Sequence, residues 1–416
     1  MMEITHNTSR DTTDSGFPED LAVEPAFMLF FSIHLHGAFT GFTRQSAGIA
    51  PLPPRQLEDY DTQFARFETQ LLGKTFVETH RITRWPLGRI ALDNLPGDTP
   101  AYADVYLICH TSGAALWEIW LPAPAQPFDT FRWIGWLDPD ARDGLIERLW
   151  RVLGPVNKEI TGKPAWSGLY FPVTVLRAPD HPLTTILERH RTNLVHLLFL
   201  DHSARPLKPR LVDEELSHDY CTREGGLTLL ARRSGLDLHG REDLAGDMHD
   251  TGLPPKSVMP FLLTIELLLI ERAVLVHLYQ QLSRSMPGSV DELLALKQEV
   301  LDALEEYYGT ITKATRFSDA VTIEGERLFG LGDLYEGVID RLDTVSFAIT
   351  TRYQKRMTLL QFWLTIVFGA TEIGFIASGI AAWYYRTNLG AVLGWTMGAS
   401  LLSGLVLVLL LRGKIE

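Results

Sequence analysis

Residues 365–390 read TIVFGATEIGFIASGIAAWYYRTNLG, an almost uninterrupted run of apolar and small side chains. Such a run predicts a membrane-crossing helix, because about 20 apolar residues span the hydrocarbon core of a bilayer. Glu372 lies in the middle of the run. A carboxylate at that depth costs several kcal/mol unless protein or water surrounds it. The stretch therefore predicts a membrane helix that keeps one face away from lipid.

This stretch belongs to the first of two apolar runs, residues 357–385 and residues 391–411, which a short link joins. Each run is long enough to cross a bilayer, so the pair predicts a transmembrane hairpin in contact with lipid. Basic residues flank the runs at the ends away from the link, at Arg352, Lys355, Arg356, Arg412 and Lys414. Basic residues concentrate on the cytoplasmic side, so both termini are predicted to be cytoplasmic and the hairpin to lie in the inner (plasma) membrane.

The rest of the chain has the composition of a water-soluble protein, with a formal net charge of −13 and a mean hydropathy of +0.03. Residues 1–20 are polar and lack the features of a signal peptide, which predicts a disordered tail. Residues 21–255 mix strand-like and helix-like patterns, which predicts a mixed α/β (α+β) cytosolic domain. The strand-like segments are 27–39, 102–110, 115–122 and 168–176, and the helix-like segments are 53–72, 140–154 and 182–198.

Residues 256–356 predict a helical stalk. Its first part is apolar enough to be a third membrane helix. Charged and titratable residues interrupt it, however, which favours a helix buried in the cytosolic domain. These residues are Glu266, Glu271, Arg272 and His277. Residues 290–315 predict an amphipathic helix. From about Gly325 a helical pattern runs without proline into the first apolar run, which predicts one very long helix.

A polar seam follows this long helix in alternating steps of four and three residues. Such a 3.5-residue repeat keeps one face toward a common axis when helices supercoil. The predicted pore-lining members are Thr351, Gln354, Thr358, Gln361, Thr365, Phe368, Glu372, Gly379 and Arg386. Toward the N-terminus the seam continues through Asp333, Gly337, Asp340, Thr344 and Phe347, and beyond Glu372 it also passes Phe375 and Ala382.

One hairpin cannot cover so long a seam, because polar residues in a membrane helix must face protein or water rather than lipid. Several copies around an axis can cover it, so the seam predicts a homo-oligomeric funnel with the first span inside and the second outside. The alternative is that the polar side chains hydrogen-bond to neighbouring helices without forming a conducting path. Small residues spaced by four predict close helix packing, at Ala370, Gly374 and Ser378 and at Gly390, Gly394 and Gly398.

Several classes of function find no support in the sequence. The acidic net charge argues against nucleic acid as a partner. No motif of nucleotide-binding, metallopeptidase or serine-hydrolase chemistry occurs, so the chain is not predicted to be an enzyme. Cys109 and Cys221 lie far apart and predict no disulfide framework, which suits a reducing compartment.

Two groups of residues have side chains of the kinds that bind metals, but neither predicts a metal site. His34 and His36 would share one face of a strand, but two histidines without a third ligand indicate surface residues. The stretch HDYCTREGG brings together His218, Asp219, Cys221 and Glu224, and its composition predicts a loop rather than a metal or nucleophile site.

The layout of residues 258–416 resembles the CorA superfamily of divalent-cation channels and transporters, which includes the ZntB branch. DLYEGVIDRLDTVSFAITTRYQKRMTLLQFW (333–363) is similar to that family's stalk entering the membrane, and GFIASGI (374–380) to the stretch before its signature. The resemblance implies a pentamer with the first spans around a pore. The family's Gly-Met-Asn signature is absent, and GIAAWYYRTNLG stands in its place. Asn388 lies outside that context, and Arg386 would place a positive ring near the outer mouth.

The resemblance implies a homopentameric channel or transporter. Its pore, lined by the first membrane span, would conduct ions, which in this family are cations, under control of the cytosolic domain. The missing signature leaves selectivity for Mg²⁺ open. Asp333 and Asp340 would form acidic stalk rings that hold a divalent cation such as Mg²⁺, or a solvated acidic face. Two alternatives stay open. The cytosolic domain would bind a small molecule, such as a nucleotide second messenger, and open an effector pore in defence, for which CRISPR-associated CorA-like proteins are a precedent. Otherwise the hairpin anchors a non-conducting scaffold.

Overall fold

The computed structural model describes residues 24–37, 39–42, 48–54, 64, 66, 69, 82–92, 102–110, 113–122, 130–141, 144–163, 166, 168–201, 203, 205–244, 258–283, 291–292, 294–295, 297–298, 300–301, 316–385 and 388–412, without the side chains of 409–412. The predicted tail (1–20), most of the predicted helices at 53–72 and 290–315, and Arg386 lie outside these residues. The chain divides into two compact units. Unit 1 comprises Met1–Arg284 and Val300–Ile339, and unit 2 comprises Ser285–Glu299 and Asp340–Glu416.

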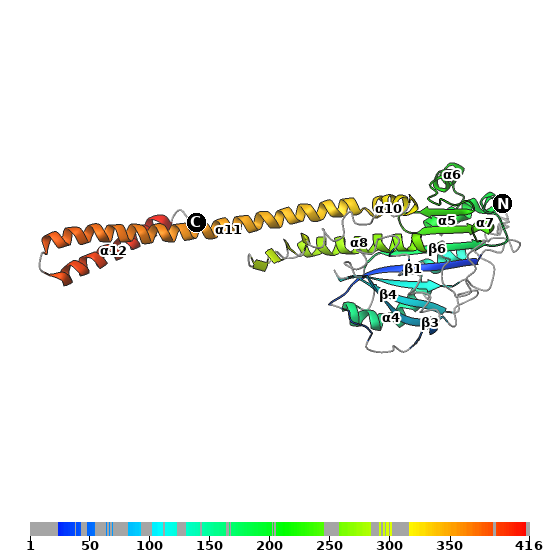
Figure 1. The fold of residues 1–416 in the computed structure, drawn as a ribbon, viewed down its shortest axis with the longest axis horizontal. Coiled ribbons are helices and arrows are strands. Elements are labelled where there is room, and N and C mark those ends of the chain that lie inside the picture. Colours follow the sequence, from blue (N-terminus) through cyan, green and yellow to red (C-terminus); the bar gives the residue numbers. More distant parts are fainter. Residues whose placement is uncertain are drawn as a thin grey trace, which may run out of the picture. The chain divides into compact units, whose positions relative to one another are not determined.

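Unit 1 is a mixed α and β structure, as the sequence predicts, and its centre is an eight-stranded sheet (Figure 1). The strand order is β2-β3-β4-β5-β1-β6-β8-β7. Paired strands are antiparallel except β6 and β8, which are parallel. The strands are β1 (Glu24–His34), β2 (Ile49–Ala50), β3 (Thr83–Ala91), β4 (Tyr102–Cys109), β5 (Ala114–Leu121), β6 (Tyr170–Ala178), β7 (Gly226–Leu230) and β8 (Gly235–Gly240). The four predicted strand segments are thus confirmed as β1, β4, β5 and β6.

β3 has a sequence that argues against a strand, because Pro86 and Gly88 interrupt it. The structure accommodates both residues with a register shift between them. Gly88 has a φ of +138°, and a Cβ placed on it would lie 2.3 Å from the carbonyl oxygen of Ala50 on β2. Only glycine fits this close approach of strands β2 and β3. The interruption is therefore a β-bulge inside the sheet, which sequence patterns do not separate from a turn.

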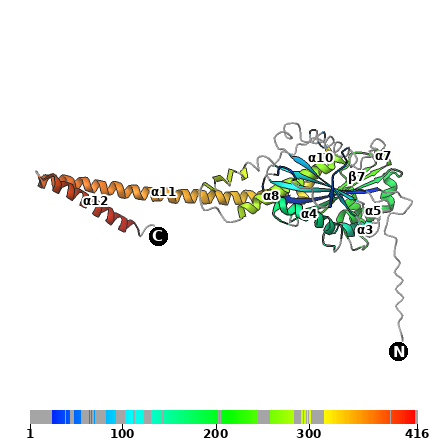
Figure 2. The same cartoon turned by 90° about the horizontal axis from the view of Figure 1, so that it is seen from below.

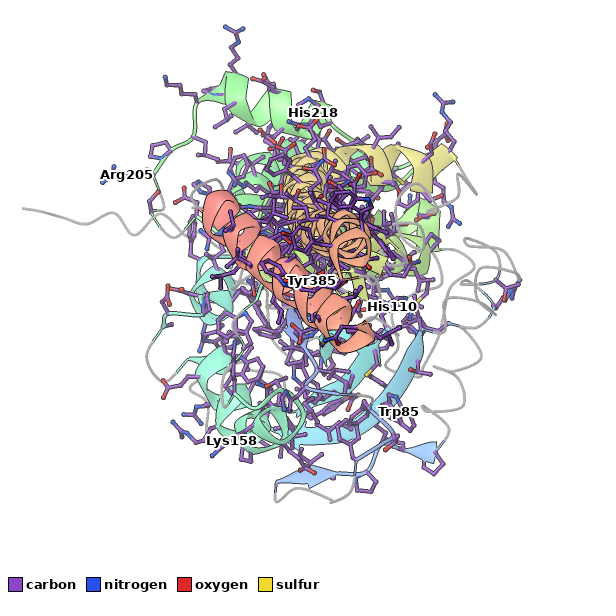
Figure 3. All side chains as sticks on the ribbon, turned by 90° about the vertical axis from the view of Figure 1, so that its left-hand side faces the viewer. Trp85, His110, Lys158, Arg205, His218 and Tyr385 are labelled. Carbon is purple, nitrogen blue, oxygen red and sulfur yellow. The ribbon has the colours of Figure 1, made fainter. Side chains whose placement is uncertain are left out.

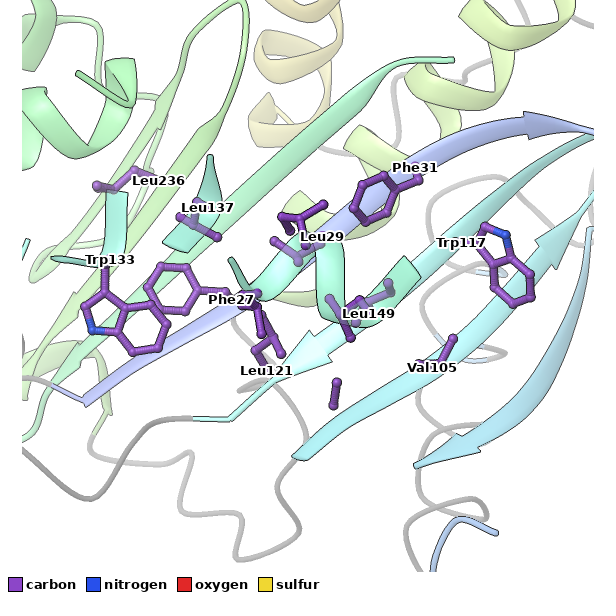
Figure 4. Close-up of a cluster of buried hydrophobic side chains, with 14 of the residues drawn as sticks. Phe27, Leu29, Phe31, Val105, Trp117, Leu121, Trp133, Leu137, Leu149 and Leu236 are labelled. Atoms are coloured by element: carbon purple, nitrogen blue, oxygen red, sulfur yellow. The ribbon is translucent and has the colours of Figure 1, made fainter. Parts of the chain in front are cut away.

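One face of the sheet is covered by α3 (Thr130–Leu137), α4 (Leu145–Thr161) and α5 (Leu183–Phe199). Alternate residues of β1 enter this layer, as the period of two in a strand requires. Figure 4 shows Phe27, Leu29 and Phe31 there, with Trp117 and Trp133 nearby. The rings of Phe27 and Trp133 stack with centroids 4.2 Å apart. The predicted helices at 140–154 and 182–198 are confirmed here as α4 and α5.

The other face is covered by α8 (Met259–Ser283), the apolar helix with interrupting charges. Its Glu266 is 1% exposed, and Nη2 of Arg84 on β3 donates to Oε1 of Glu266 at 2.7 Å. Nη1 of Arg84 also lies 3.9 Å from Oε2 of Glu118 on β5. The sheet therefore supplies the charge that lets α8 bury its carboxylate. This confirms the prediction of a helix buried in the domain rather than a third membrane span.

α10 (Arg316–Phe329) and the start of α11 (Leu331–Tyr384) run parallel to α8 (Figure 1). Contacts along the three helices keep a nearly constant sequence offset. They join Phe261 to Phe317, Leu268 to Gly325, Arg272 to Phe329 and Tyr279 to Gly337. Since the offset persists from α10 into α11, the chain stays beside α8 across the junction between them.

Gly330 separates α10 from α11. Its φ of +64° lies in the left-handed region, where a helix commonly ends at glycine. The prediction of one unbroken helix from Gly325 is therefore wrong at this single residue. From Leu331 to Tyr384 the helix is continuous for 54 residues, as predicted for the passage from stalk to apolar run.

The membrane-length part of α11 pairs with α12 (Leu389–Arg412), which returns beside it in both views (Figures 1 and 2). Both helices are long and apolar enough to cross a membrane. Small residues set their contact, since a Cβ on Gly374 would lie 2.0 Å from Oγ of Ser400. The packing prediction is thus confirmed at Gly374. Gly394 and Gly398 have no atom within 4 Å of such a Cβ, so they do not pack in this pair.

Replacing Gly374 by alanine should weaken the α11–α12 contact. The added methyl group meets Ser400, and overpacking of this kind costs about 1–3 kcal/mol. We expect a lower melting temperature of the full-length protein in detergent, measured by circular dichroism. The matched control is Gly398→Ala, because the added methyl group there meets no other atom within 4 Å. Equal melting temperatures of the two variants would contradict this account of the helix contact.

Candidate functional site

The seam in the membrane-length part of α11 lies on the face that α12 does not cover. The side against α12 carries Ile366, Gly374 and Ala381, which are buried. Gln361 and Glu372 are exposed. With about 3.6 residues per turn, the two sets lie about half a turn apart around the helix. The seam and the second apolar helix are therefore on opposite sides of α11.

The other predicted pore-lining residues of this part share the exposed face. Phe368 is one of them, and Phe375 is a further member of the seam; their side chains are 69% and 72% exposed. Thr365 and Gly379 are exposed beside them, and a Cβ on Gly379 would have no atom within 4 Å. The face is therefore an exposed surface of α11 that α12 does not cover.

In the membrane-length part of α11, the threonine hydroxyls of the seam are satisfied by their own helix. Oγ1 of Thr358 donates to the carbonyl of Gln354 at 2.9 Å, and Oγ1 of Thr365 donates to that of Gln361 at 2.8 Å. Thr371, beside the seam, makes the same bond to Val367. This bonding four residues back is common for threonine in helices. The threonines alone therefore create no need for a partner.

Gln361 and Glu372 are different, because neither side chain has a hydrogen-bond or ion-pair partner among the residues that the structure describes. They are eleven positions apart, close to three helical turns, so they point the same way within about 20°. Both polar groups must find protein or water if this part of α11 crosses a bilayer. The narrow strip that holds them is the strongest candidate for a functional surface.

Toward the N-terminus the seam does not stay on one free face. The ring of Tyr279 on α8 lies 3.3 Å from a Cβ placed on Gly337, so α8 covers the seam there. A straight helix drifts by about 20° per seven residues from a 3.5-residue repeat, and five repeats separate Gly337 from Glu372. At Gly337 the seam therefore faces α8, and its turning toward one common axis farther along the helix stays a prediction.

The members of the seam that precede the membrane-length part of α11 vary in exposure. Asp333, Asp340 and Gln354 are exposed, and Thr351 is half-buried. No group of three or more His, Cys, Asp or Glu residues with metal-binding geometry occurs in the described part of the chain. Metal-holding acidic rings at Asp333 and Asp340 stay predictions, since such rings need several copies of the chain.

The link between the helices carries a capping residue. Oδ1 of Asn388 accepts a hydrogen bond from the backbone N–H of Ala391 at 3.3 Å, which caps the start of α12. Tyr385, labelled in Figure 3, directly follows α11. Arg386, the predicted outermost pore residue, lies outside the described residues. The structure thus gives Asn388 a local role in starting the second helix.

The two groups of residues with metal-binding side chains do not form metal sites in the described residues. The imidazole of His34 stacks on that of His277 from α8, with ring centroids 3.5 Å apart and planes at 19°, while His36 follows the end of β1 and is exposed. His218, labelled in Figure 3, follows α6 (Pro209–Ser217) in a loop, as predicted. Oδ1 of Asp219 accepts backbone N–H groups of Cys221 and Thr228, so it holds the loop against β7.

A buried ionic cluster at the end of β8 escaped the sequence patterns. Nε2 of His239 lies 2.7 Å from Oδ2 of Asp237, and its Nδ1 lies 2.6 Å from Oδ2 of Asp243 on α7 (Arg241–Leu244). Oγ1 of Thr228 on β7 donates to Asp237 at 2.6 Å. The cluster joins β7, β8 and α7. Alternating polar residues in GLDLHG (235–240) were its one signal in the sequence.

The two carboxylates fix the charge of this histidine. Burial favours neutral His239, but the charge of Asp237 and hydrogen bonds with Asp237 and Asp243 outweigh burial and raise its pKa to about 10. The hydrogen bond with His239 lowers the pKa of Asp243. His239 is therefore a charged structural residue near neutral pH rather than a proton-exchanging one.

No protein-family model, no curated protein and no solved structure matches this chain. The resemblance to the CorA superfamily therefore stays a prediction, and the function rests on the geometry of the chain itself.

The His239 cluster should make stability depend on pH. Because the pKa of His239 is raised to about 10 from 6.5, its contribution is complete below about pH 6.5 and disappears as the pH rises toward 10. We expect the free energy of unfolding to fall over that range, measured by urea denaturation with tryptophan fluorescence. His239→Gln should remove the fall and cost about 3 kcal/mol at pH 7. The control is His218→Gln, at an exposed position. An unchanged pH profile in His239→Gln would contradict the cluster's role.

Proposed function

We propose that this chain forms a homo-oligomeric membrane channel, in which α11 lines a central ion path and α12 lies outside it. The observation that carries the proposal is the position of Gln361 and Glu372 on the face of α11 opposite α12. Copies arranged around an axis would turn these faces toward one another and toward water. The CorA-like layout favours five copies, with the hairpin in the inner membrane and both termini in the cytoplasm.

Two hydroxyl groups of α12 are already satisfied within that helix. Oγ1 of Thr396 donates to the carbonyl of Val392, and Oγ of Ser403 donates to that of Ser400. These bonds lie within α12 itself. A carboxylate on an axis-facing surface favours cations over anions, because rings of acidic side chains attract them. The proposed cargo is therefore a cation.

The cytosolic unit is the proposed gate. α8 is fixed to the sheet through Glu266 and Arg84, and the start of α11 runs beside α8 through the contact of Tyr279 with Gly337. A ligand that shifts the sheet relative to α8 would therefore act on the base of α11. A small-molecule signal, as in an effector pore, fits the same arrangement, while a non-conducting scaffold is the rival that the following experiments separate.

Cation flux should depend on Glu372. The full-length protein in liposomes should pass cations, and Glu372→Gln should lower that flux about tenfold because the ring of negative charge is removed. A fluorescent indicator or an ion-selective electrode measures the flux. The control is Ser378→Ala, a half-buried polar residue outside the exposed seam. Absence of flux in the unaltered protein under every condition would favour the scaffold.

Copies should meet through the exposed face of α11. In a chain with Cys109→Ala and Cys221→Ala, a cysteine at Glu372 (Glu372→Cys) should form covalent dimers with a short bismaleimide. A cysteine at Ala381 (Ala381→Cys) should give no covalent dimer, because position 381 faces α12 and is 6% exposed. Native mass spectrometry in detergent should give five copies. Covalent dimers through position 381 and none through position 372 would contradict the proposal that copies meet on the face of α11 opposite α12.

A further inference from the structure

We propose that the α11 path takes weakly hydrated monovalent cations, such as K⁺ and Cs⁺, in preference to Mg²⁺. This inference rests on the proposed channel function and adds the class of ion. It comes from the two aromatic residues beside Glu372, which differ in chemistry from the oxygen-rich lining that a hydrated divalent ion needs.

Phe368 and Phe375 flank Glu372 on the same face of α11. Phe368 is four positions before the carboxylate and Phe375 three positions after it, so both lie within about 60° of it around the helix. Along the axis they are separated from it by about 6 Å and 4.5 Å, at 1.5 Å per residue. Their exposures of 69% and 72% show that neither ring packs inside its own chain. In an oligomer, the ring of Glu372 carboxylates would therefore lie between a ring of Phe368 side chains and a ring of Phe375 side chains.

This surface offers few oxygen atoms to a hydrated ion. Between Gln361 and Gly379 the exposed strip carries two side chains with oxygen atoms, the hydroxyl of Thr365 and the carboxylate of Glu372. Mg²⁺ gives up water reluctantly and usually keeps several water ligands, which need polar partners around them. Phenyl groups offer no such partners, and apolar constrictions tend to exclude water. The strip therefore opposes the passage of hydrated Mg²⁺.

The same surface suits a cation that loses water easily. The face of a phenyl ring attracts a positive charge, and this attraction is strongest when the ion is desolvated. Large monovalent ions shed water at lower cost than Mg²⁺, because their charge density is lower. Glu372 then supplies the negative charge, and Phe368 and Phe375 supply the contacts on either side. The order of preference follows ease of dehydration, with Cs⁺ and K⁺ ahead of Mg²⁺.

The test is flux through the full-length protein in liposomes, measured with equal gradients of Cs⁺, K⁺ and Mg²⁺. We expect the K⁺ flux to exceed the Mg²⁺ flux at least about tenfold. Mg²⁺ flux as fast as K⁺ flux would overturn the inference while leaving the channel function intact. No flux of any of the three ions would instead overturn the proposed function, and the inference with it.

Two variants test the role of the aromatic rings directly. Phe375→Ser adds a hydroxyl and should raise the Mg²⁺-to-K⁺ flux ratio about tenfold. Its control is Ile380→Ser, because Ile380 is 65% exposed but lies about 140° around the helix from Phe375. Phe368→Leu keeps an apolar side chain without the aromatic face and should lower Cs⁺ flux more than it changes Mg²⁺ flux. An unchanged ion ratio in both variants would overturn the assignment.

Discussion

Glu372 imposes the physical requirement on which the proposed assembly depends, because a carboxylate in an apolar helix of membrane length must be surrounded by protein or water. α12 supplies neither, since it packs on the side of Ile366, Gly374 and Ala381. Gln361 repeats the requirement three turns away, while the hydroxyl of Thr365 between them is satisfied within the helix. Only one narrow strip of α11 therefore needs to be covered, and further copies of the chain could cover it.

α8 shows how the same requirement is met inside one chain. It is an apolar helix of 25 residues that also carries an internal glutamate. There Arg84 on β3 reaches Glu266 from the sheet, and Glu118 on β5, two strands away from β3, also lies near Arg84. Such a buried pair adds little net stability, yet removal of one partner leaves an uncompensated charge that costs several kcal/mol. Glu266 and Glu372 each interrupt an apolar run, but the fold pairs Glu266 with Arg84, whereas no described residue pairs with Glu372.

The sequence patterns predicted much of the fold, and their failures have physical causes. Strands β1, β4, β5 and β6 were found because alternating aromatic and branched side chains mark a buried strand. β3 was missed because its bulge at Gly88 has the composition of a turn. The long helix was predicted correctly except at Gly330, where a single left-handed residue ends α10. A glycine in a helical pattern does not reveal whether its backbone leaves the helix.

The seam shows most clearly which features follow from one segment of the sequence and which depend on packing between segments. From the sequence alone one could derive two membrane-length helices, a polar stripe through Glu372 and its repeat, because composition and spacing are properties of one segment. The neighbour that covers each face followed only from the tertiary structure: α8 at Gly337, α12 at Gly374 and no described residue at Glu372. The cluster of His239 with Asp237 and Asp243 likewise needed the fold. Periodicity tells which residues share a face, but the partner of that face depends on packing between segments distant in the chain.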